Sequence, residues 1–318
     1  MLAASRRGES SLPLVSVVIR SVGRTSLDQA LESVATQTYG RIEVVVVNAL
    51  GPDHPRVRES CGRFPVRLCG GEALRRSRAA NAGLAEARGE LLILLDDDDL
   101  FLPHHVADLV AALDSEPEAV LAYSNVAGRG PDGSDVHLFA EPFSATALMA
   151  GNYIPLHGAL FRRNVMLSGC RFDESLDAYE DWDFFLQLAR LGPFSHVDRT
   201  GAVYRWGGRS GVGLVADPEA GWSGRAKVYA KWKALWSGDD LVRLVEHLNE
   251  RIRGGQRLAQ ECAVCVEEAV RERDELTAEV QRLGGERDAL AATLAAAEAS
   301  YSWRLTRPLR WLHAKLHP

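Results

Sequence analysis

The sequence contains few cysteines and no long apolar run. Its five cysteines are an odd number at scattered positions, which argues against a disulfide framework and favours a reducing compartment. No apolar stretch approaches the roughly 20 residues that a membrane-spanning helix needs. The N-terminal MLAASRRGESS has two arginines but no apolar core after them, so we do not expect a secretory signal. These absences predict a cytoplasmic location.

The charge balance argues against nucleic-acid binding, and the cysteine spacing argues against a zinc site. A formal net charge of −6 argues against nucleic acid as the main partner. Cys262 and Cys265 form a lone C-x-x-C, whereas a zinc site would need a second pair or nearby histidines. We interpret both cysteines as small packed residues of a helix.

The most informative feature present is the aspartate run, residues 96–99, directly behind the apolar run LLILL at 91–95. The apolar run predicts a fully buried strand of a parallel sheet, and such sheets bind ligands at the carboxyl ends of their strands. Four adjacent carboxylates repel one another unless a counter-charge is present. A divalent cation carrying a diphosphate would supply it, because hard cations take oxygen ligands. One aspartate alone could cap the next helix, but a cap does not explain four.

The first 125 residues alternate between strand and helix patterns. This alternation predicts an α/β fold with a mostly parallel sheet flanked by helices. Acidic residues Glu180 and Asp181 begin a further helix, where the helix dipole alone would also favour them. We expect strands at 14–19, 42–47, 66–68, 91–95 and 119–123, and helices at 26–36, 77–88, 103–113 and 182–191.

A heptad repeat begins at about residue 239. Apolar residues occupy its a and d positions from Leu241 to Ala297, which is a coiled-coil pattern. Two glycine pairs interrupt it, and Arg273 and Arg287 stand at a positions. We therefore expect a homodimer or an intramolecularly packed helix pair rather than a rigid rod.

The final segment, YSWRLTRPLRWLHAKLHP, contains no acid. Its basic residues interleave with tryptophan and leucine, as in helices that lie on anionic membranes. A tail that folds back on its own domain is an equal alternative. The chain thus divides into a disordered N-terminus (1–12), an α/β domain (13–235), a helical coiled-coil region (239–300) and a basic amphipathic tail (301–318).

Four segments together resemble the family-2 glycosyltransferases, which have the GT-A fold. They are residues 15–19 with ALESVATQ at 30–37, RAANAGL at 78–84, the aspartate run, and Glu180-Asp181. Their order and spacing agree with that family over roughly residues 13–210. The terminal SWRLTRPLR also looks like tails behind coiled coils in bacterial surface-polysaccharide glycosyltransferases.

The resemblance implies inverting transfer of a sugar from a nucleotide-sugar donor to a saccharide or lipid-linked acceptor hydroxyl. The implied setting is cell-surface polysaccharide or glycoconjugate synthesis, at the inner face of the plasma membrane if the tail binds lipid. The D-x-D element of the family implies Mg2+ or Mn2+ at Asp96 and Asp98, with Asp99 as an additional ligand and Asp97 beside the donor. The metal would neutralise charge as the sugar–phosphate bond breaks.

The resemblance also implies roles around the acceptor. Asp181 matches the catalytic base, a carboxylate that takes the proton of the attacking hydroxyl. Glu180 is then an acceptor-binding or orienting group, and Trp182 is expected to bind the acceptor as well. His157 either lines the acceptor pocket or is a structural histidine.

The donor side departs from the family pattern in two places. Arg78 and Asn81 match a helix directed at the donor, where the planar fork of an arginine suits phosphate or base. The loop after the second strand carries Asn48 where acidic residues usually contact the nucleobase, although an amide still hydrogen-bonds a base edge. Arg20 replaces the usual proline after the first strand, and is either a diphosphate contact or a surface residue.

Two other functions compete with transfer. A catalytically silent nucleotide-sugar-binding or coiled-coil scaffold protein is compatible with the altered loop at Asn48. A phosphatase with an aspartate nucleophile is disfavoured, because Asp99-Leu100 lacks the residues expected there and no lysine occurs before Lys227.

Overall fold

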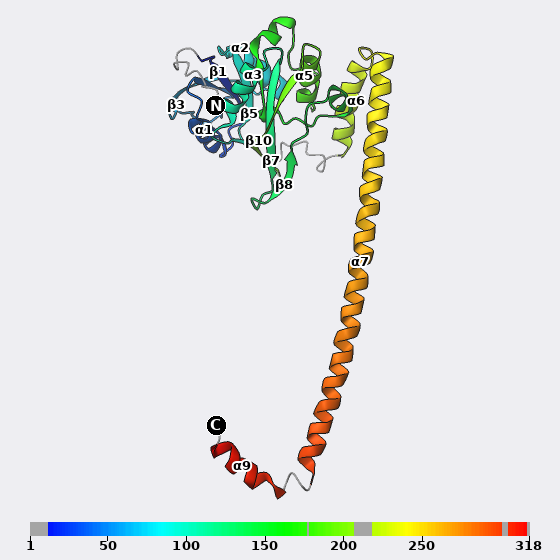
Figure 1. The fold of residues 1–318 in the computed structure, drawn as a ribbon. Coiled ribbons are helices and arrows are strands. Elements are labelled where there is room, and N and C mark those ends of the chain that lie inside the picture. The colour runs from blue at the N-terminus through cyan, green and yellow to red at the C-terminus, as the bar shows by residue number, and fades with distance from the viewer. Residues whose placement is uncertain (1–11, 177, 207–217, 301–304, 317–318) are drawn as a thin grey trace, which may run out of the picture. The chain divides into compact units, whose positions relative to one another are not determined.

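The computed structural model describes residues 12–176, 178–206, 218–300 and 305–316 (Figure 1). Its contacts divide the chain into two compact units, Met1–Leu248 and Asn249–Pro318. All but one residue of the segment predicted as disordered, 1–12, lies outside the described residues. The four-part division expected from the sequence stays a prediction.

The first unit is built on one mixed sheet. Its strands are β1 (Val15–Ser21), β2 (Ile42–Asn48), β3 (Ser60–Cys61), β4 (Phe64–Gly70), β5 (Leu91–Asp96), β6 (Leu100–Phe101), β7 (Leu121–Arg129), β8 (Asp135–Phe139), β9 (Ala159–Arg162) and β10 (Phe194–Arg205). Their order is β3-β4-β2-β1-β5-β9-β7-β10-β6, and β8 pairs with β7.

The predicted parallel pattern holds for β4, β2, β1 and β5, which pair in parallel in that order. Beyond β5 the sheet changes direction, because β9 lies antiparallel to both β5 and β7. The carboxyl ends of β1 and β5 therefore lie side by side, with Arg20 opposite Asp96. The α/β class is confirmed, and β9, which comes after residue 125, is the strand that reverses the sheet direction next to β5.

The helices expected from the sequence are present within a few residues. The α-helices of the described chain are α1 (Leu27–Ala35), α2 (Arg76–Glu86), α3 (His105–Ser115), α4 (Ala145–Ala150), α5 (Glu180–Ala189), α6 (Pro218–Trp232), α7 (Gly238–Ala299) and α9 (Arg307–Leu316). Two short 3-10 helices, η2 (Leu156–Gly158) and η3 (Arg163–Ser168), flank β9.

Alternating side chains of the central strands fill two cores. Val17 and Ile19 of β1 pack with residues of α1 and α3, whereas Val18 packs on the other face with α2, α5 and α6. This alternation follows from the period of a strand. Gly83 of α2 lies so close to the sheet that a Cβ there would overlap Val18 and Val47. Its lack of a side chain lets α2 approach the strand ends.

The helical region expected after residue 239 is present as one continuous helix, α7, which passes through both glycine pairs. The alternative of an intramolecularly packed helix pair within residues 239–299 is therefore wrong. From residue 249 onward nearly every described side chain of α7 is exposed. Cys262 and Cys265 are exposed too, so the interpretation of them as packed residues is wrong for a single copy of the chain. None of the helices in the described ranges is long and apolar enough to cross a membrane.

Candidate active site

A cavity of about 190 Å3 opens at the carboxyl ends of β1 and β5, where the sequence predicts a ligand. It lies between these strand ends, the start of α5, η2 and the end of β10. The charged and imidazole side chains that line it are Arg20, Arg76, Asp96, Asp98, Asp99, His157, Glu180, Asp181 and Arg205. The predicted base and the predicted metal ligands thus share one cavity.

Arg20 ties the first aspartate of the run to α5. Its Nε and Nη2 donate to the two carboxylate oxygens of Asp96 at 2.7 and 2.9 Å, and its Nη1 donates to Glu180 Oε1 at 3.0 Å. Arg20 is only 7% exposed, so it is no surface residue. Burial alone would raise the pKa of Asp96, but Arg20 and Arg76 lower it to about 2.

Asp97 faces away from this cavity. Its buried carboxylate accepts hydrogen bonds from Ser21 Oγ at 3.0 Å and Val22 N at 2.9 Å, and it pairs with Arg24. These bonds hold Asp97 in the loop after β1, whereas Asp96, Asp98 and Asp99 line the cavity. Asp97 therefore builds the loop after β1, and we do not retain its predicted donor contact.

Asp96, Asp98 and Asp99 offer oxygens that lie within 4.8 Å of one another. Burial, then the charge of Asp96, raises the pKa of Asp99 well above its usual range. The ionised cluster is therefore costly without a cation, and three carboxylates are a suitable oxygen set for Mg2+ or Mn2+. The residues fit the metal that the family pattern implies.

His157 lies against this cluster. Its Nδ1 is 3.2 Å from Asp99 Oδ2, and its ring stacks on Tyr204 with centroids 5.8 Å apart. Burial lowers the pKa of His157 to about 4, so the imidazole is neutral near pH 7. Its buried Nε2 has no hydrogen-bond partner among the described residues. A cavity-lining acceptor without a partner suits a ligand hydroxyl.

Asp181 lies in the first turn of α5, and Asn152 Nδ2 donates to its Oδ2 at 2.9 Å. Burial, then the charge of Glu180, raises the pKa of Asp181 to about 7. Such a value suits a general base, because the group is ready to accept a proton near neutral pH. The neighbouring Glu180 forms an ion pair with Arg20 instead.

The turn before α5 is strained. Tyr179 has φ 60°, the left-handed region, and no other non-glycine residue of the described ranges has a positive φ. Such backbone costs energy, and it is found at sites where geometry must be held. Here it aims Glu180 and Asp181 into the cavity that Tyr179 also lines.

Trp182, predicted beside the acceptor, is a core residue. It is fully buried, its Nε1 donates to Leu148 O at 2.6 Å, and its ring meets that of Tyr229 edge-on. Successive side chains on a helix are rotated by about 100°, so Asp181 and Trp182 point in different directions. Trp182 anchors the helix whose start bears the acids.

The cavity is lined by Arg76, not by the predicted Arg78. Arg78 is exposed and pairs with Glu174 at 3.5 Å. Two residues along α2 turn the side chain by about 200°, which puts the two arginines on opposite sides. Arg76 also lowers the pKa of both Asp96 and Asp181, after larger effects of burial. The sequence could have identified Arg76 only if the start of α2 were known.

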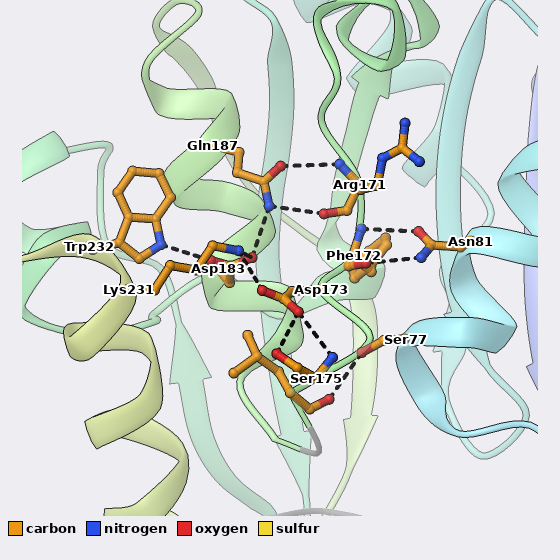
Figure 2. Close-up of polar contacts among 11 residues, drawn as sticks. Ser77, Asn81, Arg171, Phe172, Asp173, Ser175, Asp183, Gln187, Lys231 and Trp232 are labelled. Carbon is orange, nitrogen blue, oxygen red and sulfur yellow. Dashed lines mark hydrogen bonds and ion pairs between the residues drawn. The ribbon is translucent and has the colours of Figure 1, made fainter. Parts of the chain in front are cut away.

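Asn81 has a structural role, shown in Figure 2. Its Oδ1 accepts from Phe172 N at 3.0 Å, and its Nδ2 donates to Phe172 O at 2.9 Å. Ser77 of the same helix donates to Leu176 O at 3.1 Å. The two residues fasten the segment that leads into α5. Asn81 lines a separate open hollow of about 1400 Å3, which includes none of the other predicted site residues.

The other side of that segment is held by α5 and α6 (Figure 2). Buried Asp183 accepts from Trp232 Nε1 at 2.7 Å, Lys231 Nζ at 2.8 Å and Gln187 Nε2 at 2.9 Å. Lys231 also pairs with Asp173 at 2.7 Å. This network fixes α5, and therefore the acids at its start, against α6.

Asn48 is used within its own turn. Its Oδ1 accepts from the backbone N of Leu50 and Gly51 at 3.0 and 2.8 Å, and its Nδ2 donates to Gly51 O at 2.8 Å. Since its amide is committed and buried, Asn48 shapes the loop and we do not retain it as a nucleobase contact.

An aromatic wall of the cavity escaped the sequence analysis. Phe139 of β8 and Trp206, just after β10, stack with centroids 6.3 Å apart at 19°, and Tyr204 meets Trp206 edge-on. Aromatic faces are common walls of ligand sites. The alternation of Tyr204 and Trp206 along a strand was a usable signal, whereas nothing in the sequence placed Phe139 beside them.

The model of the glycosyl transferase family 2 matches residues 16–163. Residues 16–163 therefore form a glycosyl transferase family 2 domain. The chain is 27% identical over 198 residues to the uncharacterized glycosyltransferase YwdF of Bacillus subtilis, covering 60% of this chain and 73% of YwdF. It is also 27% identical over 191 residues to the O-antigen biosynthesis protein RfbC of Myxococcus xanthus, covering 57% of this chain and 15% of RfbC.

The fold is that of a solved relative. The S. aureus TarS 1-349 structure in complex with UDP-GlcNAc superposes with a TM-score of 0.58 at 18% identity, covering 74% of this chain and 72% of TarS. This likeness confirms a GT-A-type fold for the α/β unit. The family, predicted from four short segments, is confirmed as well.

Proposed function

We propose that this enzyme transfers a sugar with inversion from a nucleotide-sugar donor to an acceptor hydroxyl, with Asp181 as the base. The supporting observation is that Asp181 and the cluster of Asp96, Asp98 and Asp99 line one cavity. A single carboxylate that takes the proton of the attacking oxygen implies direct displacement, and direct displacement inverts the anomeric carbon.

The donor diphosphate belongs, in this proposal, at the aspartate cluster. A bound Mg2+ or Mn2+ would neutralise charge on the leaving diphosphate. Asp98 and Asp99 would hold it, with Asp96 kept ionised and oriented by Arg20. Arg76 adds positive charge at the same cavity. Since TarS was solved with UDP-GlcNAc, a UDP-sugar is the donor that we would test first.

The acceptor belongs between Asp181, His157 and the aromatic wall. Neutral His157 offers Nε2 to a hydroxyl, and Tyr204 and Trp206 offer faces to a sugar ring. We propose a saccharide or lipid-linked saccharide acceptor in cell-surface polysaccharide or glycoconjugate synthesis, a setting that the likeness to RfbC supports. Glu180 orients this side through Arg20.

Transfer assays with single variants test the proposal. We would first find the donor with a thermal-shift panel of UDP-, GDP- and dTDP-sugars with and without Mn2+, because ligand binding raises the apparent stability. Asp181→Asn should then reduce turnover by about 10²- to 10⁴-fold without loss of donor binding. Asp98→Asn should weaken the Mn2+ dependence of the donor shift.

Asp108→Asn, at a residue that does not line the cavity, is the matched control and should retain turnover. Normal turnover by Asp181→Asn would reject the base assignment. Donor binding with no transfer or donor hydrolysis in any assay would instead favour the catalytically silent alternative.

For the tail we propose peripheral binding to the inner face of an anionic membrane. In α9, Leu309 and Trp311 are well exposed, and the described part of the tail, residues 305–316, contains no acid. Trp303 and Arg304 lie outside the described residues. Deletion of residues 301–318 should abolish sedimentation of the protein with acidic vesicles and leave its sedimentation with neutral vesicles unchanged. Unchanged sedimentation would favour the folded-back tail.

A further inference from the structure

Helix α7 exposes an apolar stripe along most of its length. The a and d residues Val266, Leu276 and Leu290 are 61, 66 and 71% exposed. Single exposed apolar residues are ordinary, but a contiguous stripe marks an interaction surface. A seven-residue period is also the pattern of helices that pair by knobs-into-holes packing.

The two arginines that interrupt this stripe follow a common rule. Arg273 and Arg287 both stand at a, and each directly follows a glutamate at g, Glu272 and Glu286. In a parallel, in-register pair, an a side chain enters a hole whose four residues include the preceding g residue of the other helix. Each arginine would then lie beside the matching glutamate of the second copy.

The positions that flank the stripe agree with this orientation. The e positions that would face those g glutamates carry no charge over most of the repeat, so no like charges meet there. They are Asn249, Gln256, Ala263, Val270, Thr277, Gly284 and Ala291. An antiparallel pair centred near Glu279 would instead bring glutamates 272, 279 and 286 together across g positions, which is unfavourable.

We propose that α7 pairs with α7 of a second copy of this chain as a parallel, in-register coiled coil over residues 259–297. Two seam arginines, each paired to the preceding glutamate of the other copy, set the register. This proposal concerns assembly, and its failure would leave the proposed catalytic function untouched. Cys262 occupies a d position, so the two copies of this residue would face each other.

Cross-linking of the full chain tests orientation and register. In Cys69→Ser/Cys265→Ser protein, Cys262 is the only exposed cysteine, since Cys61 and Cys170 are buried. A short bis-maleimide should link two such chains covalently. A second protein, with Leu290→Cys and with Cys69, Cys262 and Cys265 all changed to Ser, should link to itself as well. Only a parallel, in-register pair allows self-linking at both d positions.

Each other result overturns the proposal. Linking of the position-262 protein to the position-290 protein in a mixture, without self-linking, means an antiparallel pair. Monomers by light scattering at all concentrations mean that α7 does not pair with itself.

Charge reversal tests the seam bridges. Glu272→Arg and Arg273→Glu should each raise the dimer dissociation constant at least about fivefold, because like charges then meet across the seam. The double variant should return to within about twofold of the parent. Arg271→Glu, at an outward f position, is the matched control and should not change the constant. Additive losses in the double variant would show that the two residues do not pair between copies.

Discussion

The α/β unit and helix α7 use the same residue types in opposite ways. In the unit, Arg20 pairs with Asp96 at 2.7 Å with only 7% of its side chain exposed. On α7, Arg282 pairs with Glu279 at 2.5 Å, and both side chains are half exposed. Nearly identical distances have different consequences, because solvent screens the second pair and leaves the first strongly coupled.

The apolar residues show the same contrast. The runs of β1, β2 and β5 are buried within their own chain, whereas the heptad stripe of α7 stays exposed. The apolar strands are thus buried within a single copy of the chain. The exposed heptad stripe of α7, in contrast, predicts a partner that covers it. Four substitutions or conditions test how far this distinction holds.

Asp183→Ala should have the largest effect on stability. It leaves buried Trp232 Nε1 without its acceptor and removes one carboxylate from Lys231 and Gln187. Since each unsatisfied buried group costs about 1–3 kcal/mol, we expect a loss of about 3 kcal/mol in the free energy of unfolding. Urea denaturation measures it. Asp183→Asn keeps the shape and one acceptor, and should lose less; equal losses would contradict the role of the network.

Arg20→Lys should have the next effect. A lysine keeps the charge but cannot hold Asp96 through two hydrogen bonds while it reaches Glu180. We expect a loss of about 1–3 kcal/mol in stability, the value of one or two charge-assisted bonds, and a fall in turnover. The neighbouring Arg24→Lys, which contacts Asp97, should retain more turnover. Full turnover in Arg20→Lys would show that the bridge does not organise the site.

The pH dependence follows from the raised pKa of Asp181, about 7. A base must be ionised, so kcat/KM should rise with pH and level off above about 7. The free energy of unfolding changes with pH in the opposite direction. Between about pH 4 and 7 the folded state binds more protons than the unfolded chain, because the pKa of Asp181 is raised on folding. The contribution of Asp181 to stability therefore falls as pH rises through that range. Asp181→Asn should remove that decline. A profile already level at pH 5 would contradict the raised pKa.

Arg282→Gln should have the smallest effect. Its pairs with Glu279 and Glu286 lie on the exposed surface of α7, where such pairs contribute little. We expect an unchanged melting temperature by circular dichroism at physiological salt. A clear decrease would mean that this face of α7 is covered, which would break the contrast between the two regions.

The sequence predicted a large part of the fold because the signals were local. The strands of apolar residues and the helix starts depend on period and composition, which neighbouring residues express. The site was harder to predict, because a shift of one or two residues along a helix changes the direction in which the side chain points. The sequence does not show whether Arg76 or Arg78, or whether Asp181 or Trp182, faces the cavity. That depends on where α2 and α5 begin.

By itself, the sequence determined the α/β class, the carboxylate cluster behind β5, the acids at the start of α5 and the heptad register of α7. Only the tertiary structure decided that Arg20 is a buried bridge between Asp96 and Glu180, that Asp97 and Asn48 build loops, and that Phe139 joins Trp206 in one wall. The physical reason is distance along the chain. Period and composition are properties of neighbouring residues, whereas a contact between residues 20 and 180 exists only after the strands between them have paired.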